Sequence, residues 1–127
     1  MALAFLVGRV IVAVYFLVNA YNHLIKGGSM VGYAASKHVP SPKAAIFLGG
    51  LLMLAGGLSV LTGIHVYWGL VALLVFMLPV TFMMHNYWKE TDPMAKMNQR
   101  IAFMKNMAII GLILMAFAIA VPWPYAF

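Results

Sequence analysis

The side chains best suited to chemistry are histidine, lysine and asparagine groups at the edges of long apolar runs. Residues 81–106 form a hairpin in which a polar turn joins two such runs, with His85 before the turn and Lys105 after it. If both runs span a membrane, these two residues lie one or two turns below the same surface, on neighbouring helices. Ionisable side chains at that depth are costly to hold and usually serve a function. The predicted pocket of hydrogen-bond donors comprises Asn19, Asn22, His23, His85, Asn86, Trp88, Lys105 and Asn106.

The charge of this predicted pocket indicates what it would bind. Lys105, and either histidine when protonated, has no carboxylate of the same chain at matching depth. Because a buried cation without a partner is unstable, an anion, a polarised carbonyl, a lipid phosphate or a partner subunit should complete the site. A quinone head group has two carbonyl oxygens and suits these donors. A lipid headgroup suits them too, with less demanding geometry.

Two metal-containing alternatives fit the same residues less well. His23 and His85 could ligate a b-type haem, but no second pair of histidines is available at that depth. The 11 methionines would suit copper, but methionine at helical spacing in an apolar chain is mostly packing material. We therefore expect neither haem nor copper. No phosphate loop, nucleophile elbow or H-E-x-x-H pattern occurs, which excludes a self-contained hydrolase or kinase.

Composition is typical of an integral membrane protein. The chain has 127 residues, of which 65% are hydrophobic and 8% charged, with a mean hydropathy of +1.00. A soluble domain of this size needs more polar surface, and spans of about 20 residues leave room for four. The absence of cysteine excludes disulfides and thiolate metal sites. We predict one all-α transmembrane domain over 1–127, a four-helix bundle with helices at 3–25, 43–63, 66–88 and 101–121 and a short interfacial helix at 30–39.

Each predicted helix has a feature that would position the pocket. The first carries polar residues on one face that should turn toward the bundle, namely Tyr15, Asn19, Asn22, His23 and Lys26. The second has glycines that predict close backbone packing, at Gly49, Gly50, Gly56, Gly57 and Gly63. Pro79 should kink the third helix. In the fourth, Lys105 shares a face with Ala102 and can point into the bundle.

The basic residues indicate how the chain crosses the membrane. Those of the first and third connections are Lys26, Lys37, Lys43, Lys89, Lys96 and Arg100. Arg9 stands alone on the other side, where it would snorkel to the surface or pair with something that the chain does not supply. The positive-inside rule places both termini outside and the predicted pocket in the cytoplasmic leaflet. Nucleic-acid binding would need a solvated basic face, which the chain lacks.

The pattern of these residues resembles the DoxX family over nearly the whole chain. It comprises Gly8-Arg9, N-x-x-N-H-L-x-K at 19–26, the paired glycines of the second helix, His85-Asn86-x-Trp88 and Phe103-x-Lys105-Asn106. The resemblance implies a four-helix protein of the prokaryotic cytoplasmic (inner) membrane. Members related to the DoxD-type subunit belong to thiosulfate:quinone oxidoreductase, and others look like accessory subunits of membrane redox or stress-response assemblies. By that likeness the site residues are Arg9, His85, Trp88, Lys105 and Asn106.

One position departs from the resemblance. Family members often hold a glutamate where Met53 stands, and its absence removes an internal counter-charge and favours an external partner. We expect a small membrane subunit of a redox complex whose pocket binds a quinone head group. It would be at most part of a quinone-linked oxidoreductase and not catalytic alone. The alternative is a non-catalytic assembly or anchoring subunit that binds lipid or a partner membrane protein. A transporter or channel is disfavoured, because no acidic residue lies inside the apolar runs.

Overall fold

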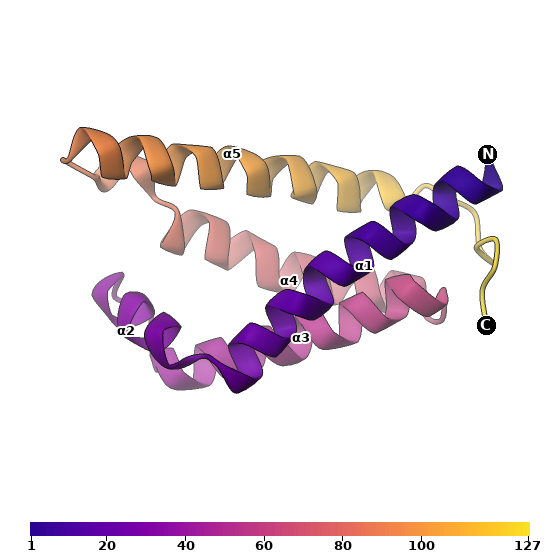
Figure 1. Ribbon diagram of the computed structural model, residues 1–127, viewed down its shortest axis with the longest axis horizontal. Coiled ribbons are helices and arrows are strands. Elements are labelled where there is room, and N and C mark those ends of the chain that lie inside the picture. The colour runs from indigo at the N-terminus through magenta and orange to yellow at the C-terminus, as the bar shows by residue number, and fades with distance from the viewer.

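The computed structural model describes residues 1–127 and contains helices without any strand. In chain order the elements are α1 (Ala2–Ile25), α2 (Gly28–Ser36), α3 (Pro42–Thr62), α4 (Val66–Met84), the 3-10 turn η1 (Tyr87–Lys89) and α5 (Pro93–Ala116). Four helical segments are long and apolar enough to cross a membrane, and the short α2 stands between the first two of them (Figure 1). The predicted all-α fold, with four spans and one short helix, is confirmed.

The glycines of α3 decide how closely its neighbours approach. Gly50 and Gly57 lie against α1, where an added Cβ would come within 2.8 and 2.9 Å of leucine side chains. Gly49 and Gly56 meet side chains of α4 in the same way. These two adjacent rows let α1 and α4 pack on two sides of the α3 backbone, as small residues do in membrane helices. The predicted close packing of this helix is confirmed.

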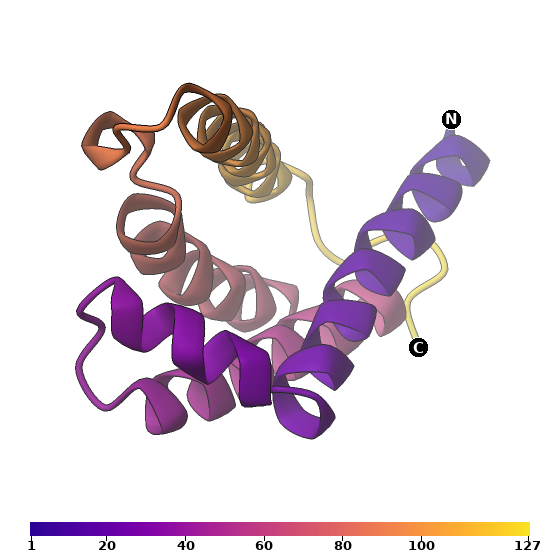
Figure 2. The same ribbon diagram turned by 60° about the vertical axis from the view of Figure 1, so that its left-hand side comes forward.

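The core lies mainly between α1, α3 and α4. Its buried side chains from these helices are Ala13, Phe16, Ala20, Met53, Val60, Val66, Leu70, Leu73 and Met77. α5 adds Ile110 and Ile113 from the face that it packs on α4. Figure 2 shows α5 beside α4 and apart from α1. Three helices therefore form a closely packed layer, and α5 is attached to it along one side.

The third span leaves the α-helix earlier than predicted. α4 ends at Met84 rather than at 88, and His85 and Asn86 lead into η1. The hydroxyl of Tyr33, from α2, donates to the carbonyl oxygen of Met84 at 3.1 Å. That carbonyl is the acceptor that the backbone N–H of Trp88 would need if the helix continued. A contact with α2 therefore occupies a carbonyl oxygen that a longer helix would use.

The fourth span begins and ends earlier than predicted. α5 starts at Pro93 rather than at 101, because the Asp92 side chain accepts a hydrogen bond of 2.9 Å from the backbone N–H of Ala95. A carboxylate cap followed by proline at the first helical position favours a helix start. α5 ends at Ala116 rather than at 121, and the segment after it carries the chain back to α1.

The two ends of the molecule differ in what they contain. α2 and the turn between α4 and α5 lie at one end, and both termini lie at the other (Figure 1). The six basic residues of the two long connections belong to the α2 end. Four crossings account for this arrangement, since an even number of spans returns the chain to its starting side. Which end faces the cytoplasm stays a prediction.

Candidate functional site

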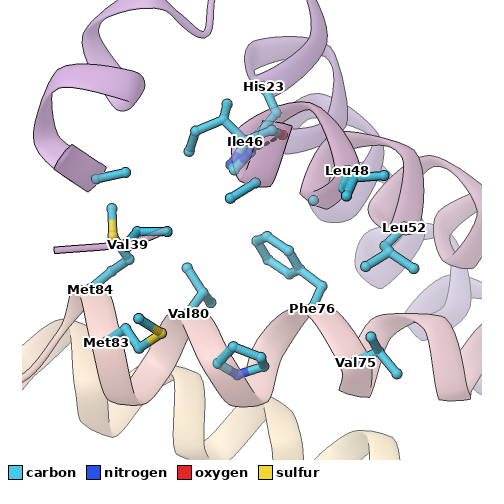
Figure 3. Close-up of a pocket in the computed structure, with 14 residues that line it drawn as sticks. His23, Val39, Ile46, Leu48, Leu52, Val75, Phe76, Val80, Met83 and Met84 are labelled. Atoms are coloured by element: carbon cyan, nitrogen blue, oxygen red, sulfur yellow. Dashed lines mark hydrogen bonds between the residues drawn. The ribbon is translucent and has the colours of Figure 1, made fainter. Parts of the chain in front are cut away.

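A cavity of about 170 Å³ lies between α2, α3 and α4 (Figure 3). Of its 14 lining residues 11 are hydrophobic, among them Ala34 of α2, Ile46 of α3 and Phe76 of α4. An engineered apolar cavity of about 150 Å³ binds benzene, so a space of this size takes roughly one six-membered ring. The space is therefore apolar and large enough for a flat ring or a short stretch of acyl chain.

His23 is the one ionisable side chain on the cavity wall. It stands in the last turn of α1, and its Nδ1 lies 3.2 Å from the carbonyl oxygen of Ile46. Gly50 makes room for this approach, because an added Cβ there would come 3.0 Å from the Cβ of His23. The imidazole also meets the ring of Phe76 edge to face, with the centroids 5.5 Å apart. Two neighbouring helices therefore hold the imidazole in place.

The contact with Ile46 determines which nitrogen of His23 can serve a ligand. A carbonyl oxygen only accepts, so Nδ1 carries a proton and donates it to this hydrogen bond. In the neutral ring Nε2 is then an acceptor, and it makes no hydrogen bond within the chain. Such an acceptor suits a hydroxyl group, whereas a carbonyl oxygen would require a protonated ring. The cavity thus combines room for a ring with an acceptor for a hydroxyl.

A separate cluster of polar side chains joins α2 and its C-terminal cap to the turn after α4 and to the first turns of α5. We name it the polar clasp, and it comprises Tyr33, Lys37, His85, Asn86, Glu90 and Gln99. Lys37 Nζ lies 2.8 Å from the carboxylate of Glu90 and donates to the Asn86 side chain at 2.7 Å. His85 Nδ1 donates to Gln99 Oε1 at 2.8 Å, and the Gln99 amide donates in turn to the hydroxyl of Tyr33. These groups therefore serve as one another's partners.

Mutual pairing gives the polar clasp a structural role. Its ion pair is mostly covered, with the Lys37 and Glu90 side chains 13% and 26% exposed. Satisfied polar networks of this kind rigidify the segments that they connect. Here they hold α2 across the turn between α4 and α5. Because Ala34 of α2 lines the cavity, the clasp also fixes one cavity wall.

Lys105, Asn106 and Trp88 lie outside both the cavity and the clasp. Lys105 Nζ lies over the ring of Tyr15, 5.7 Å from its centroid, and makes no hydrogen bond or ion pair within the chain. Asn106 is buried on the face of α5 that packs on α4. Trp88 meets Phe103 edge to face, with the ring centroids 5.6 Å apart. Of these three residues, Lys105 alone presents an unpaired charge.

The polar face of α1 also divides in the structure. Asn19 donates to the backbone carbonyl oxygen of Tyr15 at 2.7 Å and so is satisfied within its own helix. Asn22 is half-buried, and His23 lines the cavity. No side-chain hydrogen bond joins any two of the residues predicted for the pocket, and only His23 among them lines the cavity.

Arg9 is held by its own chain at the opposite end of α1. Its guanidinium donates to the carbonyl oxygens of Leu61 and Tyr125, each at 3.1 Å, and to that of Pro124. The side chain is buried, with only 4% exposed, and lies against the ring of Trp123. Both expectations for Arg9, snorkelling and an external partner, are therefore wrong. The segment after α5 folds back and supplies the acceptors, which local sequence did not indicate.

Sequence reasoning missed four members of the polar clasp: Tyr33, Lys37, Glu90 and Gln99. A signal existed for the ion pair, because Glu90 is one of only two acidic side chains and the basic residues of the first connection lie at the same end. Tyr33 and Gln99 gave no such signal, since neutral polar residues in a connection are ordinary. The cavity depends on the packing of three helices and has no local signature.

Comparison with known proteins identifies one family. A sequence model of the DoxX family matches residues 4–86, which is more than half of the chain and reaches from α1 through α4. The matched part contains the cavity and His23, and it ends before α5 and Lys105. No curated protein and no solved structure matches the chain.

Proposed function

Because the chain belongs to the DoxX family of membrane proteins, we propose that it is a small subunit of a membrane redox complex that holds a quinol or quinone ring beside His23. The observation that carries the proposal is an apolar cavity of about 170 Å³ with one fixed imidazole on its wall. We place the ring at His23 rather than at His85 or Lys105, because these two residues do not line the cavity.

The cavity walls suit a ring that arrives from the lipid phase. Leu48 and Val75 line the cavity and are also 57% and 53% exposed on the outer surface, where lipid would lie. An isoprenoid tail could therefore remain among lipid chains while the ring enters. Phe76 offers an aromatic face, and Met83 offers a flexible side chain that adapts to ring substituents. These features support a lipid-soluble ligand over a water-soluble one.

The protonation of His23 supports the reduced form as the better ligand. With Nδ1 donating to Ile46, Nε2 of the neutral ring accepts a hydrogen bond. A quinol offers a hydroxyl for that bond, whereas the oxidised ring offers only carbonyl oxygens. The chain would thus bind and orient quinol, and electron transfer would take place in the partner subunits of the complex.

The location that we propose is the prokaryotic cytoplasmic membrane, with both termini outside. Basic residues are concentrated at the α2 end, and such residues favour the cytoplasmic side, which supports this orientation. Because the chain has no cysteine, single cysteines can be introduced without background. In whole cells, a membrane-impermeant maleimide should label Tyr125→Cys and leave Ser29→Cys unlabelled. The reverse pattern would overturn the proposed orientation.

Ligand titration tests the proposed function. Purified protein in detergent is titrated with a short-tailed quinol and with its quinone by isothermal calorimetry. Wild type should bind the quinol more tightly, and His23→Leu should lose at least tenfold in affinity, or about 1.4 kcal/mol. His85→Leu is the matched control, and circular dichroism checks that both variants fold. Absence of binding, or equal affinities for wild type and His23→Leu, would contradict the proposal.

A role in assembly is the second candidate function. It is favoured by Lys105, which stands in a membrane-spanning helix without a hydrogen bond or ion pair of its own chain. Charges in such places usually meet a partner. The two functions are compatible, because a quinol-binding subunit of a redox complex must also contact the protein that takes the electrons.

A further inference from the structure

Lys105 is a cation in a membrane-spanning helix for which the chain supplies no counter-charge. Its Nζ lies 5.7 Å from the centroid of the Tyr15 ring, and no carboxylate is in reach. The chain has two acidic side chains. Glu90 pairs with Lys37 at 2.8 Å, and Asp92 caps α5. A counter-charge for Lys105 must therefore come from another molecule.

Lys105 lies on a side of α5 that the other helices leave uncovered. Asn106, Ile110 and Ile113 form the buried face of α5, which packs on α4. Successive residues of a helix are roughly 100° apart, so Lys105 points away from that face. It turns toward Tyr15 of α1, but α1 and α5 are separated along most of their length (Figure 2). The side chain of Lys105 is accordingly exposed.

The depth of Lys105 helps to identify its counter-charge. Along α1, the distance from Tyr15 to Lys26, which caps the end of the helix, is about 16 Å. The hydrocarbon core is about 30 Å thick, so Nζ of Lys105 beside Tyr15 lies nearer its middle than its surface, deeper than the one or two turns predicted from the sequence. A lysine paired with a lipid phosphate would instead snorkel toward the headgroups. This position favours a counter-charge that is itself held inside the membrane.

We propose that the surface between α1 and α5, defined by Tyr15 and Lys105, docks a transmembrane helix of a partner protein with an aspartate or glutamate near its middle. The carboxylate pairs with Lys105, because lipid solvates neither charge. The exposed Ile101 and Leu112, one turn before and two turns after Lys105 on the same face of α5, provide apolar packing for such a helix. A second copy of the chain does not supply the carboxylate, since Glu90 and Asp92 are engaged. This docking surface goes beyond quinol binding and is separate from the His23 cavity.

A synthetic transmembrane peptide tests the proposal. The probe is a leucine-alanine helix of about 20 residues with one central glutamate, and the matched peptide carries glutamine there. Fluorescence energy transfer measures the binding of each peptide to labelled protein in phosphatidylcholine vesicles at pH 8. Wild type should bind the glutamate peptide at least tenfold more tightly than the glutamine peptide. Lys105→Met should lose this preference, whereas Lys96→Met, near the exposed start of α5, should keep it.

Three outcomes would overturn the docking surface. The first is equal binding of the two peptides by wild type, and the second is a preference that survives in Lys105→Met. The third combines two results: wild type but not Lys105→Met enriches phosphatidylglycerol around itself, and the peptide preference disappears in vesicles of that lipid. Together these results would assign Lys105 to a lipid phosphate. His23→Leu should retain the preference, so failure of quinol binding and failure of docking are distinguishable.

Discussion

The cavity beside His23 and the polar clasp around His85 lie at the same end of the molecule, and each contains one histidine. Their surroundings are opposite. The cavity walls are mostly apolar, and His23 is their one ionisable group. In the clasp, six polar side chains are one another's partners, with His85 bound to Gln99 at 2.8 Å. A ligand in the cavity meets an unused acceptor, whereas a ligand at the clasp must displace existing hydrogen bonds.

The surroundings of a histidine, rather than its position at the end of an apolar run, therefore decide whether it is available to a ligand. α2 connects the two regions, because Ala34 lines the cavity while Tyr33 and Lys37 belong to the clasp. One region therefore provides the space and the other holds its wall. Substitutions that alter only one region can separate these roles.

Filling the cavity should have the largest effect. Ala45→Phe places a ring in the space between α3 and α4, so quinol affinity should fall by about a hundredfold, or about 2.7 kcal/mol. Ala44→Phe is the matched control, because Ala44 is the exposed neighbour on the same helix and does not line the cavity. Calorimetric titration of both variants measures the difference. Similar losses in the two would argue against the cavity as the binding site.

Displacing the His23 side chain by a substitution at Gly50 should have the next largest effect on quinol binding. Gly50→Ala adds a Cβ 2.8 Å from the Leu24 side chain and 3.0 Å from the Cβ of His23. Such overpacking should lower the free energy of unfolding by about 2 kcal/mol and weaken quinol binding. Gly111→Ala, with no atom near its added Cβ, should be neutral or stabilise by about 0.5 kcal/mol. Unfolding by sodium dodecyl sulfate in mixed micelles measures both, and equal stabilities would refute the close approach of α1 to α3.

Opening the polar clasp should have a smaller effect, and mainly on α2. Lys37→Met leaves Glu90 and the mostly buried Asn86 without their partner and should destabilise the protein by about 1 kcal/mol. Amide hydrogen exchange in α2 should accelerate, and quinol affinity should fall by about threefold as one cavity wall loosens. Lys43→Met, an exposed lysine outside the clasp, serves as the control. Unchanged exchange in α2 would show that the clasp does not hold it.

Removing the clasp histidine should have the smallest effect on binding. His85→Leu breaks the hydrogen bond to Gln99, but His85 does not line the cavity. Quinol affinity should therefore stay within about twofold of wild type, which is below 0.5 kcal/mol. Titration under the conditions used for His23→Leu makes the comparison direct. A tenfold loss would return the ligand to the site that sequence reasoning first favoured.

The sequence was sufficient for the fold because membrane spans are local patterns. Apolar runs predicted the four spanning helices, and the glycines of α3 predicted close packing that Gly50 and Gly57 display against α1. The start of α5 was missed although its signal was local, since Asp92 and Pro93 form a cap followed by proline. The first two turns of α5 are polar, so hydropathy alone does not separate them from the connection.

The candidate site could be predicted only in part, because it depends on contacts between distant segments. His23 and His85 looked alike in sequence, with each beside an asparagine at the end of an apolar run. Only packing places one of them against Ile46 and the cavity, and the other against Gln99. Arg9 likewise needed the returning C-terminal segment before its partners were visible.

Photolabelling locates the ligand most directly. A short-tailed azidoquinone, reduced to its quinol, is irradiated with the purified protein, and the modified residues are mapped by mass spectrometry with and without excess unlabelled quinol. We predict displaceable adducts on cavity residues such as Ile46, Phe76 and Met83. Displaceable adducts confined to the turn from η1 into α5, or adducts that excess quinol does not suppress, would contradict a ring-binding site beside His23.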